Sequence, residues 1–154
     1  MAHLKKIGFW LLIGMAVSLS GRLNAQQDLQ ISKVFEQYGK KKGTVMVQLT
    51  KEMLQDYNFS FFKSIVIKND SAAIAFAREC VAKDQEGAKK IKQVVQNGKI
   101  TSIVLELAPR DKDNRLILYN ESLEGNAALT LIYLESPMDV EKIMTMILKK
   151  NNKL

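Results

Sequence analysis

Three segments toward the C-terminus carry apolar residues in the pattern of β-strands. They cover residues 100–108, 115–121 and 127–135, and turn-rich connections at 109–114 and 122–126 separate them. Connections of this size commonly join antiparallel neighbours, so the three segments are predicted to form a β-meander. The third segment is apolar on both faces, which favours a central position in the sheet.

The first half of the chain predicts two more strands and a short helix. Residues 44–49 and 63–68 alternate apolar and polar side chains, as strands do. Residues 28–38 place their apolar side chains on one helical face, and residues 51–56 fit a single helical turn.

Residues 71–97 form the longest helical pattern. Their apolar side chains recur at helical spacing, and Asp84 is the one polar residue within that stripe. Gly87 marks a place where this helix could break, since glycine costs about 1 kcal/mol inside a helix. A last helix is predicted after the meander, with Ser136 as its N-cap and Pro137 in its first turn.

This order of elements differs from the regular strand–helix alternation of a parallel sheet. It predicts an α+β domain with a mostly antiparallel sheet of four to five strands. The helices are expected to pack on one face of that sheet, and the C-terminal meander is followed by a helix.

Residues 1–25 have the three parts of a cleavable secretory signal peptide. Two lysines precede an uncharged apolar stretch at residues 8–20, and cleavage is predicted between Ala25 and Gln26. A retained membrane anchor is the alternative, but a spanning helix needs about 20 apolar residues. No cysteine stands at the cleavage point, which argues against a lipid anchor. The protein is therefore expected to be exported, periplasmic or secreted, with no stable transmembrane anchor after cleavage.

The remaining residues, 26–154, have the size of one domain. The chain has 23 Lys and Arg against 16 Asp and Glu, and the leader removes three basic residues and no acidic one. That leaves 20 basic against 16 acidic residues, a net charge of +4. Such a charge suits solubility and argues against nucleic acid as a partner.

Residues 31–39 leading into 43–47, together with 114–118 and 128–135, resemble the small exported domains of unknown function that are common in Bacteroidota. The end of the leader at residues 24–26 belongs to the same resemblance. These motifs concern the fold, so the resemblance implies an envelope address and brings no active site with it.

The mature chain lacks the residues of several kinds of catalytic site. Its leader carries the only histidine, which excludes Ser-His-Asp and Cys-His catalysis and His-ligated metal sites. Cys80 is the only cysteine, and on an apolar helix face it is expected to be buried and inert. Met144 and Met146 point in different directions on a helix, which argues against a copper site. No phosphate-binding glycine motif is present, and no cofactor is expected.

Glu106 is the acid of most chemical interest. It lies in the middle of a predicted strand, on the face opposite to Leu105 and Leu107. In a half-apolar groove it would be a plausible general acid or base, whereas plain strand alternation makes it a solvated side chain. The sequence places no second carboxylate beside it.

Taken together, these features favour a non-enzymatic envelope protein that binds a protein or a surface component through the second sheet face and its hairpin loops. Two alternatives stay open: a small carboxylate-dependent hydrolase that uses Glu106, and an accessory protein of envelope stress or regulation. The candidate contact residues lie in the basic connection before the first strand and at the first hairpin of the meander: Lys40, Lys41, Lys42, Arg110, Asn114 and Arg115.

Overall fold

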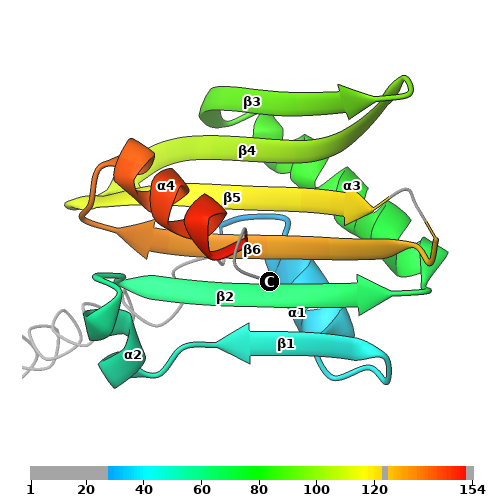
Figure 1. Cartoon of the computed structure of the whole chain (residues 1–154), viewed down its shortest axis with the longest axis horizontal. Helices are drawn as coiled ribbons and strands as arrows, with labels where there is room; N and C mark the ends of the chain where they lie inside the picture. The colour runs from blue at the N-terminus through cyan, green and yellow to red at the C-terminus, as the bar shows by residue number, and fades with distance from the viewer. Residues whose placement is uncertain (1–27, 123–124, 152–154) are drawn as a thin grey trace, which may run out of the picture.

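The computed structural model describes residues 28–122 and 125–151. Within them, six strands form one antiparallel sheet in the order β1-β2-β6-β5-β4-β3 (Figure 1). The strands are β1 Thr44–Gln48, β2 Phe61–Lys68, β3 Ala88–Gln96, β4 Lys99–Arg110, β5 Asp113–Ser122 and β6 Ala128–Ser136. The helices are α1 Ser32–Tyr38, α2 Lys51–Asp56, α3 Ser71–Gln85 and α4 Val140–Asn151.

The C-terminal strands confirm the predicted meander. β4, β5 and β6 are consecutive antiparallel neighbours, and β6 lies in the interior of the sheet between β5 and β2. The apolar pattern on both faces of β6 is explained by this position. Leu131 and Tyr133 are buried on one face, and Leu134 is buried on the other.

The predicted helix over residues 71–97 is wrong in its second half. α3 ends at Gln85, and residues 88–96 form β3, which gives the sheet six strands instead of the four to five expected. Asn97 and Gly98 both have a positive φ, 51° and 73°, and they join β3 to β4 in a tight hairpin. An Asn-Gly pair is the strongest short-range hairpin signal, and pairing with β4 outweighs the helical spacing of the apolar residues.

Helices cover both faces of the sheet, so the expectation of helices on one face is also wrong. α1 and α3 cover one face, here called the α1/α3 face, where Ile65 and Leu105 are fully buried. α4 covers the opposite face, here called the α4 face, and packs Ile143 against Leu116 and Leu134. Figure 1 looks onto the α4 face, with α1 and α3 behind the sheet. Central strands that are apolar on both faces require a cover on both.

The start of α4 differs from the prediction by three residues. The helix begins at Val140, and the carboxylate of Asp139 accepts a hydrogen bond from the backbone N–H of Glu141 at 3.3 Å. Ser136, the predicted N-cap, is the last residue of β6. Its hydroxyl oxygen still accepts a hydrogen bond from the backbone N–H of Met138 at 3.1 Å, as an N-cap side chain does. The same hydroxyl donates to the carbonyl of Asn58 at 2.8 Å, so it ties β6 to the segment before β2.

Candidate functional site

A hollow of about 420 Å³ opens on the α4 face beside α4. β1, β2 and β6 form its floor, and α2 and α4 contribute to its sides. Most of the side chains that line it are aliphatic, aromatic or methionine side chains. The lining residues of this hollow, here called the apolar pocket, are Val47, Leu49, Met53, Tyr57, Phe59, Phe62, Ser64, Ile132, Met146 and Ile147.

Three aromatic rings between the end of α2 and the start of β2 shape the pocket. The ring centroids of Tyr57 and Phe59 lie 6.1 Å apart and those of Phe59 and Phe62 lie 5.8 Å apart, and both pairs are stacked. Asn58 has a φ of 54°, a left-handed conformation that asparagine tolerates, and its carbonyl accepts the bond from Ser136. This turn directs the chain from α2 into β2 and holds the rings together.

The apolar surface continues from the pocket toward the edge of the sheet. Val47 and Met53 line the pocket and still expose 43% and 44% of their surface, and Val45, two residues before Val47, exposes 59%. Contiguous exposed apolar surface on a soluble domain commonly marks an interaction site. The pocket was missed in the sequence, although the density of aromatic residues at 57–62 is a signal that could have identified it.

The pocket offers contact surface instead of reactive groups. Among its lining residues, only Tyr57 and Ser64 carry side-chain hydroxyls, and none is charged. A ligand that removes apolar surface from water here gains about 25 cal/mol per Å². Met53 and Met146 have flexible side chains that adapt to irregular partners.

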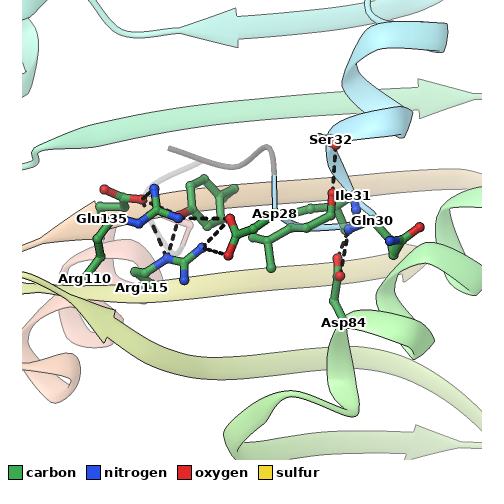
Figure 2. A network of polar contacts seen from close by, with 10 residues as sticks. Asp28, Gln30, Ile31, Ser32, Asp84, Arg110, Arg115 and Glu135 are labelled. Atoms are coloured by element: carbon green, nitrogen blue, oxygen red, sulfur yellow. Dashed lines mark hydrogen bonds and ion pairs between the residues drawn. The ribbon is translucent and has the colours of Figure 1, made fainter. Parts of the chain in front are cut away.

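A polar network on the α1/α3 face has Arg115 at its centre (Figure 2). Arg115 donates from Nε to the Tyr133 hydroxyl at 2.9 Å and from Nη2 to the two carboxylate oxygens of Asp28 at 3.0 and 3.1 Å. Arg110 also donates to Asp28, at 2.9 Å, and the Tyr133 hydroxyl donates to Glu135. Through Asp28 the network fastens the segment before α1 to β4 and β5, and through Tyr133 and Glu135 it links these strands to β6.

Two members of this network, Arg115 and Tyr133, have shifted pKa values. Burial works against the charged form of Arg115, but its bonds to Tyr133 and Asp28 outweigh burial and raise the pKa of Arg115. Burial and the hydrogen bond to Glu135 raise the pKa of Tyr133. Arg115 therefore stays charged and Tyr133 stays protonated, as in a structural ion-pair cluster.

The candidate contact residues at the first hairpin of the meander are engaged within the protein. Arg110 and Arg115 belong to the network just described. Asn114 donates from Nδ2 to the carbonyl of Met138 at 2.8 Å, which links the hairpin to the connection before α4. Their role in binding a partner stays a prediction, and such a contact would compete with these internal bonds.

The basic candidates Lys40, Lys41 and Lys42 are exposed in the connection between α1 and β1. Nζ of Lys41 lies 4.6 Å from the centre of the Tyr38 ring, a cation–π contact. β1 is separated from β5 by β2 and β6, so the fold does not gather the lysines and the hairpin residues into one site.

Asp84, the polar residue in the apolar stripe of α3, has a structural role that the sequence did not reveal. Its carboxylate accepts hydrogen bonds from the backbone N–H of Gln30 at 2.7 Å and of Ile31 at 2.9 Å (Figure 2). Backbone N–H groups at the start of a helix have no hydrogen-bond acceptor within that helix. The Asp84 carboxylate, which belongs to α3, is the acceptor for these N–H groups before α1. Burial raises the pKa of Asp84, although both of these hydrogen bonds act to lower it.

Glu106 lies in a polar hollow of about 410 Å³ on the α4 face. Nζ of Lys89 is 3.6 Å from its carboxylate, and two more lysines line the same hollow. Asp139 and Glu141, at the start of α4, contribute further carboxylates that the sequence could not place there. The structure thus puts Glu106 among other charged groups, away from the apolar pocket.

Cys80 is buried, as predicted, and burial followed by the nearby Asp84 charge raises the pKa of its thiol. In the part of the chain that the structure describes, no three His, Cys, Asp or Glu side chains are grouped so as to hold a metal ion. None of the helices described is long and apolar enough to cross a membrane. The predicted cleavage point between Ala25 and Gln26 lies outside the described residues.

Comparison with known families finds a match between residues 18–147 and the model of a family of unknown function, DUF6108. The matched range includes all six strands of the sheet. No curated protein and no solved structure was found to match the chain.

Proposed function

Since the chain belongs to DUF6108, a family of unknown function, we propose a role for it from its own structure: a non-enzymatic module that binds a partner protein through the apolar pocket. The observation that carries this proposal is the uncharged, aromatic-lined hollow of about 420 Å³, which continues into exposed apolar surface. A domain of this size gains nothing in stability from leaving such surface open to water.

Two features favour apolar side chains of a protein as the occupant of the pocket. A site for a small metabolite usually combines apolar walls with several well-placed polar groups. The side chains that line this pocket supply only two polar groups, the hydroxyls of Tyr57 and Ser64. The exposed apolar surface also extends beyond the pocket to Val45, which a small molecule inside the pocket would not cover. The two pocket methionines suit a partner surface of irregular shape.

A selection of displayed random peptides on the purified chain from residue 26 onward tests the proposal. Selected peptides should share a large apolar side chain, and Met53→Glu should weaken their binding about tenfold or more by placing a charge in the pocket. Val94→Glu is the matched control, because Val94 is 50% exposed on β3 and lies outside the pocket. Equal binding by the Met53→Glu variant would contradict the proposal, as would capture of a fatty acid with no peptide selected.

We further propose that the module works in the cell envelope, because residues 1–25 have the form of a signal peptide. Mass spectrometry of the chain recovered from cells should find Gln26 at its N-terminus. A chain that begins at Met1 and stays in the membrane fraction would contradict export with cleavage.

A carboxylate-dependent hydrolase is the second candidate, favoured by the three acids Glu106, Asp139 and Glu141 around one hollow. Turnover of ester or glycoside substrates that is lost in Glu106→Gln, with unchanged stability, would support it. Turnover that persists in Glu106→Gln would exclude Glu106 as its acid or base.

A further inference from the structure

The two edge strands of the sheet, β1 and β3, have different character. β3 carries Lys89, Lys90 and Lys92, and charged side chains of this kind block edge-to-edge pairing of sheets. β1 has the sequence TVMVQ, without a charge or a proline, and exposes 59% of Val45. An uncharged edge rich in β-branched residues is suited to pair with another strand.

The register of β1 shows which of its backbone groups are open to such a strand. The N–H of Leu49, just after β1, donates to the carbonyl of Phe62 in β2 at 3.4 Å. Because the backbone groups of successive residues point alternately to the two sides of a strand, those of Thr44, Met46 and Gln48 point away from β2. The N–H of Thr44 already donates to the carbonyl of Lys41 at 3.2 Å, so the donors left for another strand are the N–H groups of Met46 and Gln48. In Figure 1 this side of β1 is the outer edge of the sheet.

β1 is self-complementary about Met46. If a second β1 lies antiparallel with the two Met46 residues opposite each other, each Met46 N–H meets the Met46 carbonyl of the partner subunit. Each Gln48 N–H then meets the Thr44 carbonyl of the partner subunit. On the α4 face, Val45 of each copy lies beside Val47 of the partner subunit, so exposed apolar side chains cover each other.

Charges on either side of β1 favour this antiparallel arrangement. Lys40, Lys41 and Lys42 precede the strand, and α2 after it carries Glu52 and Asp56 against Lys51, a net charge of −1; all six side chains are exposed. Antiparallel pairing brings the basic connection of each copy next to α2 of the other copy. A parallel arrangement would instead place the two sets of lysines together, where like charges repel.

We propose that two copies of the mature chain associate through β1 about a two-fold axis at Met46. The two sheets then form one continuous sheet, and the two apolar pockets lie near each other on its α4 face. A two-fold contact of this kind is the commonest form of soluble homo-oligomer. The contact is short, so the dimer forms and dissociates reversibly with protein concentration. It rests on β1 and its flanking charges. Val47 also lines the apolar pocket, so in the dimer the second copy covers the Val45 and Val47 surface that continues from the pocket in a monomer.

Sedimentation velocity of the chain from residue 26 onward, over low to high micromolar concentration, measures the association. Val45→Lys should raise the dimer dissociation constant about tenfold or more, since it puts a charge into the paired edge. Val95→Lys is the matched control, because Val95 is also 59% exposed but lies on β3, and it should leave the constant unchanged. A monomer at all concentrations, or a dimer lost only in Val95→Lys, would overturn the proposal.

Cysteine crosslinking in a Cys80→Ala background tests the register separately. Directly opposed residues of a hydrogen-bonded antiparallel pair have Cα atoms about 5.5 Å apart, within the range for a disulfide. Met46→Cys alone should therefore crosslink on oxidation, and Thr44→Cys should crosslink only when mixed with Gln48→Cys. A Val95→Cys variant that crosslinks as readily as Met46→Cys would overturn the assignment of β1. Peptide binding to the pocket of a monomer would remain unaffected by that result.

Discussion

Replacement of Arg115 by methionine removes the centre of the polar network while keeping much of the apolar volume of the side chain. Arg115 is 8% exposed, and its Nε lies 3.7 Å from the carboxylate of the buried Glu135. Removal of one partner from a buried ion pair costs about 3–5 kcal/mol. Arg110 keeps its own contact with Glu135, at 3.5 Å. We therefore expect a loss at the lower end, about 3 kcal/mol of the free energy of unfolding.

A second network with the same chemical groups provides the matched control. The Tyr119 hydroxyl donates to Glu121 as that of Tyr133 does to Glu135, and Arg78 donates to both carboxylate oxygens of Glu121 at 2.8 and 2.9 Å. Arg78 is 55% exposed, so water screens its ion pair. We expect Arg78→Met to cost about 1 kcal/mol or less, as exposed pairs do.

Urea unfolding of the chain from residue 26 onward, at neutral pH, compares the two variants. Arg115→Met should have a clearly lower midpoint at an unchanged slope, and Arg78→Met should lie close to the wild type. Addition of Glu135→Gln to Arg115→Met should recover part of the lost free energy of unfolding. The double variant no longer has a buried carboxylate at position 135 that lacks its ion-pair partner Arg115. Equal losses for Arg115→Met and Arg78→Met would refute the reasoning that burial sets the magnitude.

Three further outcomes follow from buried or constrained residues. Burial raises the pKa of Asp84 above its ordinary 3.8, so the folded protein binds this proton more tightly than the unfolded chain does. The wild type should therefore gain stability relative to Asp84→Asn as the pH falls toward about 4, as urea unfolding at several pH values measures. Cys80, with a buried thiol of raised pKa, should react with iodoacetamide only as the chain opens, and fast labelling of the native protein would contradict this. Gly98→Ala should cost about 1 kcal/mol in thermal unfolding because φ is 73°, whereas Gly87→Ala, at an ordinary φ, should be neutral or stabilising.

Sequence patterns identified those elements whose signal is local. The meander and β1 follow from alternation, and α2 has the predicted bounds, residues 51–56. β3 was predicted as helix because its apolar residues continue the spacing of α3. The Asn97-Gly98 pair is a local hairpin signal that favours β3, but the pairing with β4 that outweighs helical spacing is a contact that periodicity does not report. Periodicity also does not report which face of the sheet a helix covers. α4 packs on the sheet through contacts with Leu116 on β5 and Leu134 on β6, which its own sequence does not reveal.

The candidate site was predictable only in part for a related reason. The predicted binding face was the one without helices, whereas the apolar pocket lies on a face that α4 partly covers, and partner binding there stays a prediction. The pocket itself forms where β1, β2, β6, α2 and α4 meet, an arrangement of segments far apart in the sequence. Arg110 and Arg115 were predicted to contact a partner. Their observed partner Asp28 lies more than 80 residues earlier in the sequence, so the sequence could not show the network.

Methionine methyl resonances offer the most direct test of pocket binding. Residues 26–154 contain five methionines, and of these Met53 and Met146 line the pocket, while Met138 and Met144 pack in the core under α4. Titration of the methyl-labelled chain with a selected apolar peptide should shift the signals of Met53 and Met146 in a saturable manner and leave those of Met138 and Met144 nearly unchanged. Saturable binding that leaves the Met53 and Met146 signals in place would contradict the assignment of the apolar pocket as the binding site.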